Sequence, residues 1–310
     1  MPRQPDAGGD GMTTDWQQQR ERSHPVMLRL LVWIARALGR GVARLLLLPV
    51  VGYFMLTSGA AGVASRDYLQ RVLGREPNWR DRARHFHCFA SVALDRFFFA
   101  AGTLDAFDVR YHRPPEIEAL VRSGRGCVLL LAHVGGYEAM RVAGSAQRRL
   151  PLRMLMDLAH NRMFIDLMRR LNPDFMTRVI DASQRGPTLV LALKQVLDEG
   201  AMVGIMADRV LADERAIAVN FLGDAARLPA GPWILAGTLG VPVILAFGLY
   251  RGGNRYDVHF ELFAEQLALP RATREAALSA HAQAYALRLE HYARLAPYNW
   301  FNFYNFWLSP

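Results

Sequence analysis

The sequence predicts an α/β protein: a single domain with a mostly parallel central sheet flanked by helices, preceded by a helical N-terminal arm that associates with a membrane. Short apolar runs alternate with helical segments over the second half of the chain, which is typical of βαβ units. Within that half, Cys127 to Leu131 are consecutive apolar residues, as expected for a strand covered on both faces. The uncharged stretch Leu45 to Ser65, which follows a basic amphipathic segment, predicts the arm.

The N-terminal part is predicted to contain a leader and the arm. Residues 1–14 are rich in Gly, Pro and Asp without periodicity, so we expect a disordered leader without a secretory signal. Residues 15–65 form the arm, whose uncharged part reaches the roughly 20 residues that cross a bilayer. Pro49 and Gly52 also fit a helix or helical hairpin that lies in the cytoplasmic leaflet, with arginines on anionic head groups. An ordinary core helix is the alternative. Residues 66–310 are the predicted domain.

The domain begins with two helices, the second over Trp79 to Ala100, and continues with alternating elements. Strands are expected near Phe107 to Tyr111, Cys127 to Ala132, Arg153 to Met156, Thr177 to Ile180, Ala201 to Met206, Ala216 to Phe221, Val241 to Tyr250 and Tyr256 to Phe263. Further helices are expected near residues 114–123, 137–149, 161–171, 187–199, 230–240 and 271–295.

Composition indicates contact with membranes and acidic partners. The 310 residues carry a formal net charge of +9, with 52% hydrophobic and only 21% charged residues. Such a basic surface suits anionic lipids or an acidic protein, and nucleic acid ranks last because no nucleic-acid-binding motif is present. Two cysteines give no disulfide framework. His85 and His87 lie two residues apart, on different sides of a predicted helix, so no metal site is expected there.

The strongest candidate for chemistry follows the Cys127 strand. His133 and Glu138 flank Gly135 and Gly136, where the chain turns from strand into helix. In such a turn Glu138 can fold back to hydrogen-bond one imidazole nitrogen while the other faces a cleft. A histidine held this way is a general base that can activate an alcohol or amine. The alternative is that His133 merely ends a strand and Glu138 is a solvated residue of the first helical turn.

Two other positions are candidate substrate contacts. Asp208 and Arg209 follow the predicted strand that ends at Met206, at the sheet edge where open α/β sheets place ligands, although a salt-bridged turn is the alternative. Gly231 and Pro232 stand at a predicted helix start, where free amides and the positive end of the helix dipole can face an anion. Alternatively, these two residues only mark the end of a turn and the start of the helix.

Longer segments around these residues resemble the lipid A biosynthesis acyltransferase family of the lysophospholipid acyltransferase superfamily. LLLAHVGGYE resembles its signature of a histidine, four residues and a glutamate, and the segment from Asn220 to Arg251 resembles its third and fourth blocks. The tail YNWFNFYNFW resembles the ending of a subgroup found with aryl polyene and related glycolipid pathways, and its aromatics suit a membrane interface, an acyl-chain tunnel rim or a core strand.

The chain also departs from the family pattern. Ala207 replaces the proline that usually precedes the aspartate, and Asn305 replaces a tail aspartate. Near Asp157 the better-known members have an arginine that this chain lacks, although Arg162 could substitute for it. A phosphorylated lipid A precursor is therefore in doubt as the acceptor.

The resemblance implies an O-acyltransferase at the cytoplasmic face of the inner membrane. It would move an acyl group from an acyl carrier protein thioester to a hydroxyl of a lipid or glycolipid, with His133 as base, Glu138 orienting it, and no metal or cofactor. Backbone amides at Gly135 and Gly136, or Arg209, would stabilise the oxyanion. The acceptor could instead be an aryl polyene lipid, an ornithine lipid or another lysophospholipid. Outside enzymes, the alternative is a lipid-binding or transport component on a degenerate acyltransferase fold.

Overall fold

The computed structural model describes residues 39–100, 102–144, 152–158, 169, 177–183, 186–211 and 214–307. The predicted leader, Arg162 and most of the predicted helix over residues 161–171 lie outside the described residues.

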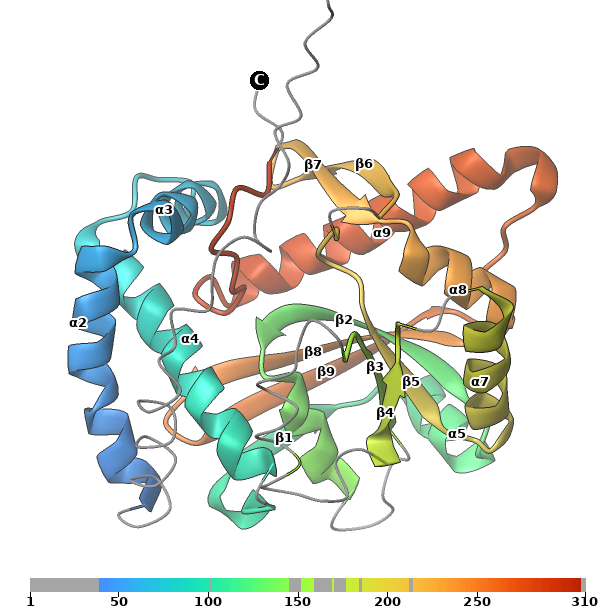
Figure 1. Ribbon diagram of the computed structural model, residues 1–310, viewed down its shortest axis with the longest axis horizontal. Coiled ribbons are helices and arrows are strands. Elements are labelled where there is room, and N and C mark those ends of the chain that lie inside the picture. Colours follow the sequence, from blue (N-terminus) through green and yellow to red (C-terminus); the bar gives the residue numbers. More distant parts are fainter. Residues whose placement is uncertain are drawn as a thin grey trace, which may run out of the picture.

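A seven-stranded sheet forms the centre of the molecule, in the order β1-β9-β8-β2-β5-β3-β4 (Figure 1). Every neighbouring pair is parallel except the antiparallel pair β8 and β9, which confirms the predicted fold class. The strands of this sheet are β1 (Asp108–His112), β2 (Cys127–Gly135), β3 (Leu152–Met156), β4 (Val179–Asp181), β5 (Met202–Met206), β8 (Val243–Gly252) and β9 (Arg255–Ala264).

Helices cover both faces of this sheet. They are α2 (Leu47–Thr57), α3 (Gly59–Leu73), α4 (Trp79–Ala100), α5 (Pro115–Ser123), α7 (Pro187–Asp198), α8 (Gly231–Leu239) and α9 (Arg274–Leu295), with 3-10 helices η1 (Leu104–Ala106), η2 (Tyr137–Gly144) and η4 (Arg271–Thr273). Residues 137–144 were expected to be α-helical and are 3-10 instead.

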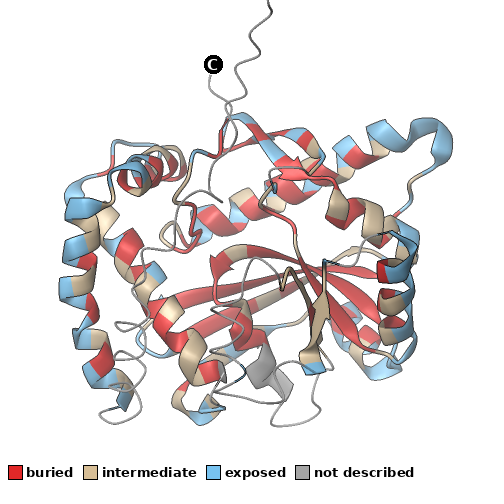
Figure 2. Ribbon diagram, in the orientation of Figure 1, coloured by how far each residue is buried: buried red, intermediate tan, exposed pale blue. Residues whose placement is uncertain are grey.

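Alternation along β2 explains why its apolar run is continuous. Val128 and Leu130 point into a core shared with α7, α8 and α9, whereas Leu129 and Leu131 point into a core shared with α4 and α5. Both faces of the strand are therefore buried from solvent, as its composition predicted. Figure 2 shows the buried residues concentrated along these central strands.

A second, two-stranded sheet consists of β6 (Ala216–Phe221) and β7 (Asp224–Pro229). β7 was not predicted, because DAARLP has an Asp, two Ala and a Pro in place of β-branched residues. Leu222 and Gly223 both have positive φ, 52° and 96°, as a tight hairpin turn requires.

The part of the N-terminal arm that the structure describes, from Gly39 on, packs against α4. Ala43, Leu47 and Leu94 form a small buried cluster, and Arg40 makes two hydrogen bonds of 2.7 Å to the buried carboxylate of Asp95. The helical stretch Gly39–Thr57 has 19 residues and a mean hydropathy of 1.4, so it is long and apolar enough to cross a membrane by length and composition.

The C-terminal segment crosses the carboxyl ends of the central strands. Trp300 forms a β-bridge with Val134 at the end of β2, and Trp307 forms one with Ala226 in β7. Both indole side chains are buried. The aromatic tail is therefore part of the core, which was the alternative to a membrane interface or tunnel rim.

Candidate active site

His133 and Asp208 meet at the carboxyl ends of two neighbouring parallel strands. Leu131 of β2 is in register with Met206 of β5, so the residues two places further along each strand lie at the same level. His133 Nδ1 lies 2.8 Å from Asp208 Oδ1, and the backbone N–H of His133 donates to Oδ2 at 2.9 Å. These two contacts hold the imidazole ring of His133 against the fully buried carboxylate of Asp208.

The hydrogen bond to Asp208 determines which nitrogen of His133 can act as a base. An ionised carboxylate only accepts hydrogen bonds, so Nδ1 carries the proton and Nε2 carries the lone pair. Nε2 has no hydrogen-bond partner among the residues that the structure describes. Because the side chain keeps 31% of its surface exposed, a substrate can reach the ring.

The charges around the ring favour its neutral form. Burial lowers the pKa of His133, and the positive charge of Arg209 lowers it further, while Asp208 partly offsets both effects. Burial alone would raise the pKa of Asp208, but attraction to His133 and Arg209 and its hydrogen bonds bring that pKa down to about 2. At neutral pH the pair is therefore a charged carboxylate beside a neutral imidazole.

Trp300 in the C-terminal segment supports Asp208, and His85 of α4 in turn supports Trp300. Trp300 Nε1 donates to Asp208 Oδ2 at 3.1 Å, and the carbonyl oxygen of Trp300 lies 2.9 Å from His85 Nε2. Because a carbonyl only accepts, His85 Nε2 donates, and its Nδ1 accepts from Ser65 Oγ at 2.9 Å. Burial lowers the pKa of His85 to about 4, so this buried ring stays neutral. A hydrogen-bonded chain thus runs from Ser65 in α3 to His133.

Glu138 makes no hydrogen bond to His133 among the described residues, in contrast to the predicted contact, and its role in the reaction stays a prediction. Its Oε1 accepts a hydrogen bond from Arg96 Nε, while Oε2 has no hydrogen-bond partner among the described residues. Arg96 also donates to the Tyr137 hydroxyl at 2.8 Å. The physical reason is competition: α4 presents a permanently charged guanidinium to Glu138, and a charge-assisted pair outweighs a hydrogen bond to a neutral imidazole.

The predicted oxyanion donors at the glycine turn are already engaged. The N–H of Gly135 donates to Asn299 O at 2.7 Å, and that of Gly136 donates to Gly248 O at 2.8 Å. Gly135 also has a φ of +60°, and a Cβ there would collide with Gly248 O. These glycines therefore allow close backbone packing, which corrects the expectation that their amides face the substrate.

Arg209 remains beside the histidine. It donates a hydrogen bond of 2.7 Å to Phe301 O, and its guanidinium lies 5.6 Å from the centre of the Tyr304 ring. Its charge is one of the causes that lower the pKa of His133. Of the predicted substrate-binding residues, Asp208 and Arg209 therefore lie at the histidine.

The start of α8 has a partner from the protein itself. The carboxylate of Glu214 accepts hydrogen bonds from the N–H groups of Leu211 and Gly231. A negatively charged side chain thus occupies the helix N-terminus at Gly231 and Pro232, where a substrate anion was expected.

Comparison with protein families identifies the chain. A family model described as "Bacterial lipid A biosynthesis acyltransferase" matches residues 115–309, which include His133, Glu138 and Asp208. The chain belongs to this family. The match makes the protein an acyltransferase with a lipid-like acceptor and confirms the family resemblance, while the aryl polyene subgroup stays a prediction. No curated protein matches the chain.

In this acyltransferase, three residues around the histidine were not singled out as site residues by the sequence analysis. Arg96 binds Glu138, Trp300 binds Asp208, and His85 holds the Trp300 backbone. The sequence singled out His85 only as a metal ligand beside His87, and that role was rejected. Its burial beside an aromatic tail is a tertiary feature that spacing along the chain does not encode.

Proposed function

We propose that this acyltransferase moves an acyl group from an acyl carrier protein thioester to a hydroxyl of a membrane lipid or glycolipid, with His133 as general base. One observation carries the proposal. His133 is hydrogen-bonded through Nδ1 to the buried carboxylate of Asp208, and its ring is otherwise partly exposed. That arrangement fixes the tautomer and leaves Nε2 for the acceptor hydroxyl.

The reaction follows from this tautomer. Nε2 removes the hydroxyl proton as the acceptor oxygen attacks the thioester carbonyl carbon, and a tetrahedral oxyanion forms. The charge of Asp208 stabilises the imidazolium. When the intermediate collapses, the C–S bond breaks and the imidazolium returns its proton to the departing thiolate. The products are an ester and a free thiol, and the histidine is regenerated without a metal or cofactor.

Arg209 is the proposed oxyanion donor, because the glycine amides are engaged. Its guanidinium has five N–H donors and only one is used at Phe301 O among the contacts described. The attraction between this fixed positive charge and the oxyanion becomes stronger as negative charge develops on the oxygen. This stabilises the transition state and lowers the barrier.

Charge and family membership support the proposed donor and acceptor. Acyl carrier proteins are acidic, and this chain carries a formal net charge of +9, so electrostatic attraction supports an acidic carrier protein as the proposed donor. The acceptor is proposed to be a lipid other than a phosphorylated lipid A precursor, because Asp157 stands near the position of the family's usual arginine.

His133→Ala tests the base assignment. The full-length protein in lipid nanodiscs is given acyl-loaded carrier protein and extracted bacterial lipids, and acylated products are measured by mass spectrometry. We expect the rate to fall about a hundredfold or more, since the base is lost. His281→Ala, a histidine on α9 that contacts Ala268 O, is the matched control and should retain activity. A parent protein that binds lipid without transfer would favour the lipid-binding alternative, and an active His133→Ala variant would contradict the mechanism.

The exposed side of α2 supports association with the cytoplasmic face of the inner membrane. Leu48 is 59% exposed and Leu56 is 89% exposed, although Leu47, next to Leu48, is buried against α4. An apolar stripe facing outward fits insertion between lipid chains. The double variant Leu48→Glu and Leu56→Glu is expected to float with vesicles of anionic lipid less than the parent does. Leu191→Glu is the control, because Leu191 is 67% exposed on α7. Equal flotation of both variants would place the membrane contact elsewhere.

A further inference from the structure

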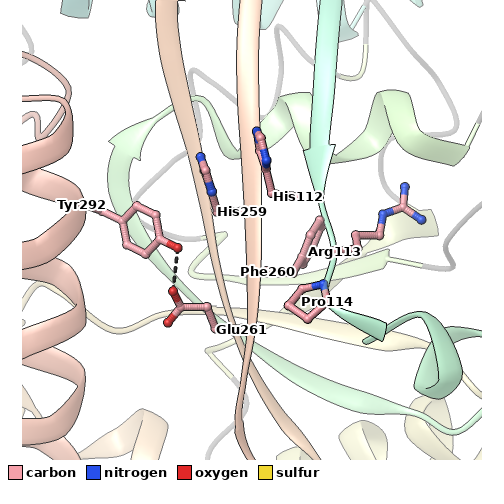
Figure 3. Close-up of a pocket in the computed structure, with 7 residues that line it drawn as sticks. All are labelled: His112, Arg113, Pro114, His259, Phe260, Glu261 and Tyr292. Atoms are coloured by element: carbon pink, nitrogen blue, oxygen red, sulfur yellow. Dashed lines mark hydrogen bonds between the residues drawn. The ribbon is translucent and has the colours of Figure 1, made fainter. Parts of the chain in front are cut away.

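Two histidines stand side by side on neighbouring strands, away from His133. His112 of β1 is in register with His259 of β9, and their rings are 4.2 Å apart with an interplanar angle of 6°. Figure 3 shows the two imidazoles next to each other, with the Arg113 guanidinium directed away from them. Because Asp257 lies two residues before His259 on the same strand, its side chain is on the same face of the sheet.

This group faces the opposite side of the sheet from His133. Phe247 of β8 pairs with His259 and belongs to the core on the α9 side. His133 instead continues the alternation of Leu129 and Leu131, which point to the α4 side. The histidine pair borders a pocket of about 370 Å³ that Glu261 and Tyr292 also line. A ligand here would not enter the candidate active site.

Some of the polar atoms around the histidine pair have hydrogen-bond partners and others have none. His259 Nε2 is buried and has no hydrogen-bond partner among the residues that the structure describes. Glu261 is engaged by Arg288 and by the Tyr292 hydroxyl. A buried imidazole nitrogen without a partner is unfavourable, and a metal ion is one ligand that would satisfy it.

We propose that His112, His259 and Asp257 form a binding site for a divalent transition metal ion of the zinc class. Their ligand atoms all lie within 4.8 Å of one another. Two imidazoles and one carboxylate are donors that Zn²⁺ favours, whereas Mg²⁺ and Ca²⁺ favour oxygen. Three protein ligands leave a fourth position for water on the pocket side.

Metal binding requires a rotation of one side chain and no movement of the strands. The stacked rings have parallel planes, so their lone pairs do not yet converge on one point. His112 is exposed, and its ring can turn toward His259 while the strand register holds both Cα positions. The ion thus replaces a ring stack with two metal ligands.

Two neighbouring arginines limit the affinity of this site for a metal ion, and substituting one of them tests that effect. Arg251 Nε donates to Asp257 Oδ2 at 2.8 Å, and Arg255 lies 3.4 Å from Oδ1. The Arg255 side chain is 44% exposed, so it can leave Oδ1 to the metal. Its positive charge nevertheless opposes a dication, and Arg255→Gln should tighten binding.

The test measures the binding of Zn²⁺, with no other ligand added, to the full-length protein in detergent. A chelator first removes any metal already bound. We expect equilibrium dialysis to show that the parent protein binds one equivalent of Zn²⁺. The variants His112→Gln and His259→Gln should lose this bound ion, whereas the control His281→Gln should keep it. Substitution with Co²⁺ should give the visible absorption of a low-symmetry, four-coordinate site in the parent only. Arg255→Gln should lower the dissociation constant severalfold.

The exposed position of His112 keeps the test decisive. His112→Gln removes a ligand without disturbing the core, so it decides the matter even if His259→Gln fails to fold. Equal zinc binding by the parent and His112→Gln overturns the proposal, and so does a parent that binds none. The measurement does not involve acyl transfer, so its outcome is independent of the proposed function.

Discussion

Two buried carboxylates lie near the candidate base, and their partners differ. Asp208 is fully buried and accepts hydrogen bonds from His133 and Trp300, whereas Glu138 is 7% exposed and accepts from Arg96. A carboxylate on an imidazole stabilises a charge that appears only during proton transfer. A carboxylate on a guanidinium neutralises a charge that is always present. The first can act on the reaction, and the second acts mainly on the fold.

The pKa shifts support this division. Burial lowers the pKa of His133, while Asp208 opposes that shift. Burial also acts to lower the pKa of Arg96, but Glu138 and Tyr137 outweigh it and raise that pKa. Arg96 therefore stays charged at any pH at which the protein is folded, and only the His133 pair changes protonation near the working pH.

The largest effect is expected from Asp208→Asn. The amide keeps the size of the side chain but loses its charge, so the imidazole loses its tautomer control and the imidazolium loses its counter-ion. We expect kcat/KM for acyl transfer to fall by about 10²- to 10⁴-fold. Asp95→Asn is the matched control, because Asp95 is also fully buried and hydrogen-bonded but pairs with Arg40 and Tyr256.

The pH profile gives a second readout of the same variant. His133 acts as a base only when it is neutral, so the rate falls as pH drops through its pKa, which burial places below the usual 6.5. Because the charge of Asp208 raises that pKa, its removal should move the midpoint of the acid limb to still lower pH. A midpoint that does not move, with an unchanged rate, would contradict the pairing of Asp208 with His133.

A smaller effect on rate is expected from Glu138→Gln. This change leaves Arg96, whose side chain is 33% exposed, without its carboxylate. We expect the free energy of unfolding to fall by about 1–3 kcal/mol, less than for a fully buried pair because solvent reaches the guanidinium. The rate should fall by no more than about tenfold, because the hydrogen-bonded pair of His133 and Asp208 is unchanged.

The double variant of Glu138→Gln and Arg96→Gln is the control for this interpretation. Removal of both charges should recover part of the stability lost with one, as measured by urea denaturation. If Glu138→Gln instead loses as much rate as Asp208→Asn at unchanged stability, then Glu138 acts on the reaction itself.

The same two carboxylates show what could be predicted from the sequence. The five apolar residues from Cys127 predicted a doubly covered strand, and the charged residues after Met206 predicted a second strand end. Their meeting requires β2 and β5 to be neighbours, and strand order is not encoded in local spacing. Glu138 lies within reach of His133 along the chain, but spacing gives no sign of Arg96, a competitor 42 residues away on α4.

The tail shows the same limit. Its alternation of Asn and aromatic residues fitted an interface, a tunnel rim or a core strand equally well. The choice depends on which surface the tail meets, and it meets the end of β2 at Val134 and β7 at Ala226. Asn299 shows why the polar residues are tolerated there, since its side chain bonds both the N–H and the C=O of Tyr250.

The smallest effect, and the most specific, is expected from Trp300→Phe. Phe keeps an aromatic ring in the core but removes the N–H that donates to Asp208 Oδ2. Trp307→Phe removes an equivalent N–H, which donates to Phe221 O at 3.0 Å. Both variants should lose about 1–3 kcal/mol of stability, because each leaves a buried acceptor with one partner fewer.

Only Trp300→Phe should also change the reaction. With one donor fewer, Asp208 becomes a stronger acceptor for His133 Nδ1, so the imidazole pKa should rise and the acid limb of the rate profile should move to higher pH. That shift is opposite in sign to the one expected for Asp208→Asn. The rate above the limb should fall by about threefold, less than the loss of a full hydrogen bond, since Asp208 keeps both bonds to His133. Equal pH profiles for Trp300→Phe and Trp307→Phe would show that the tail supports the fold without tuning the base.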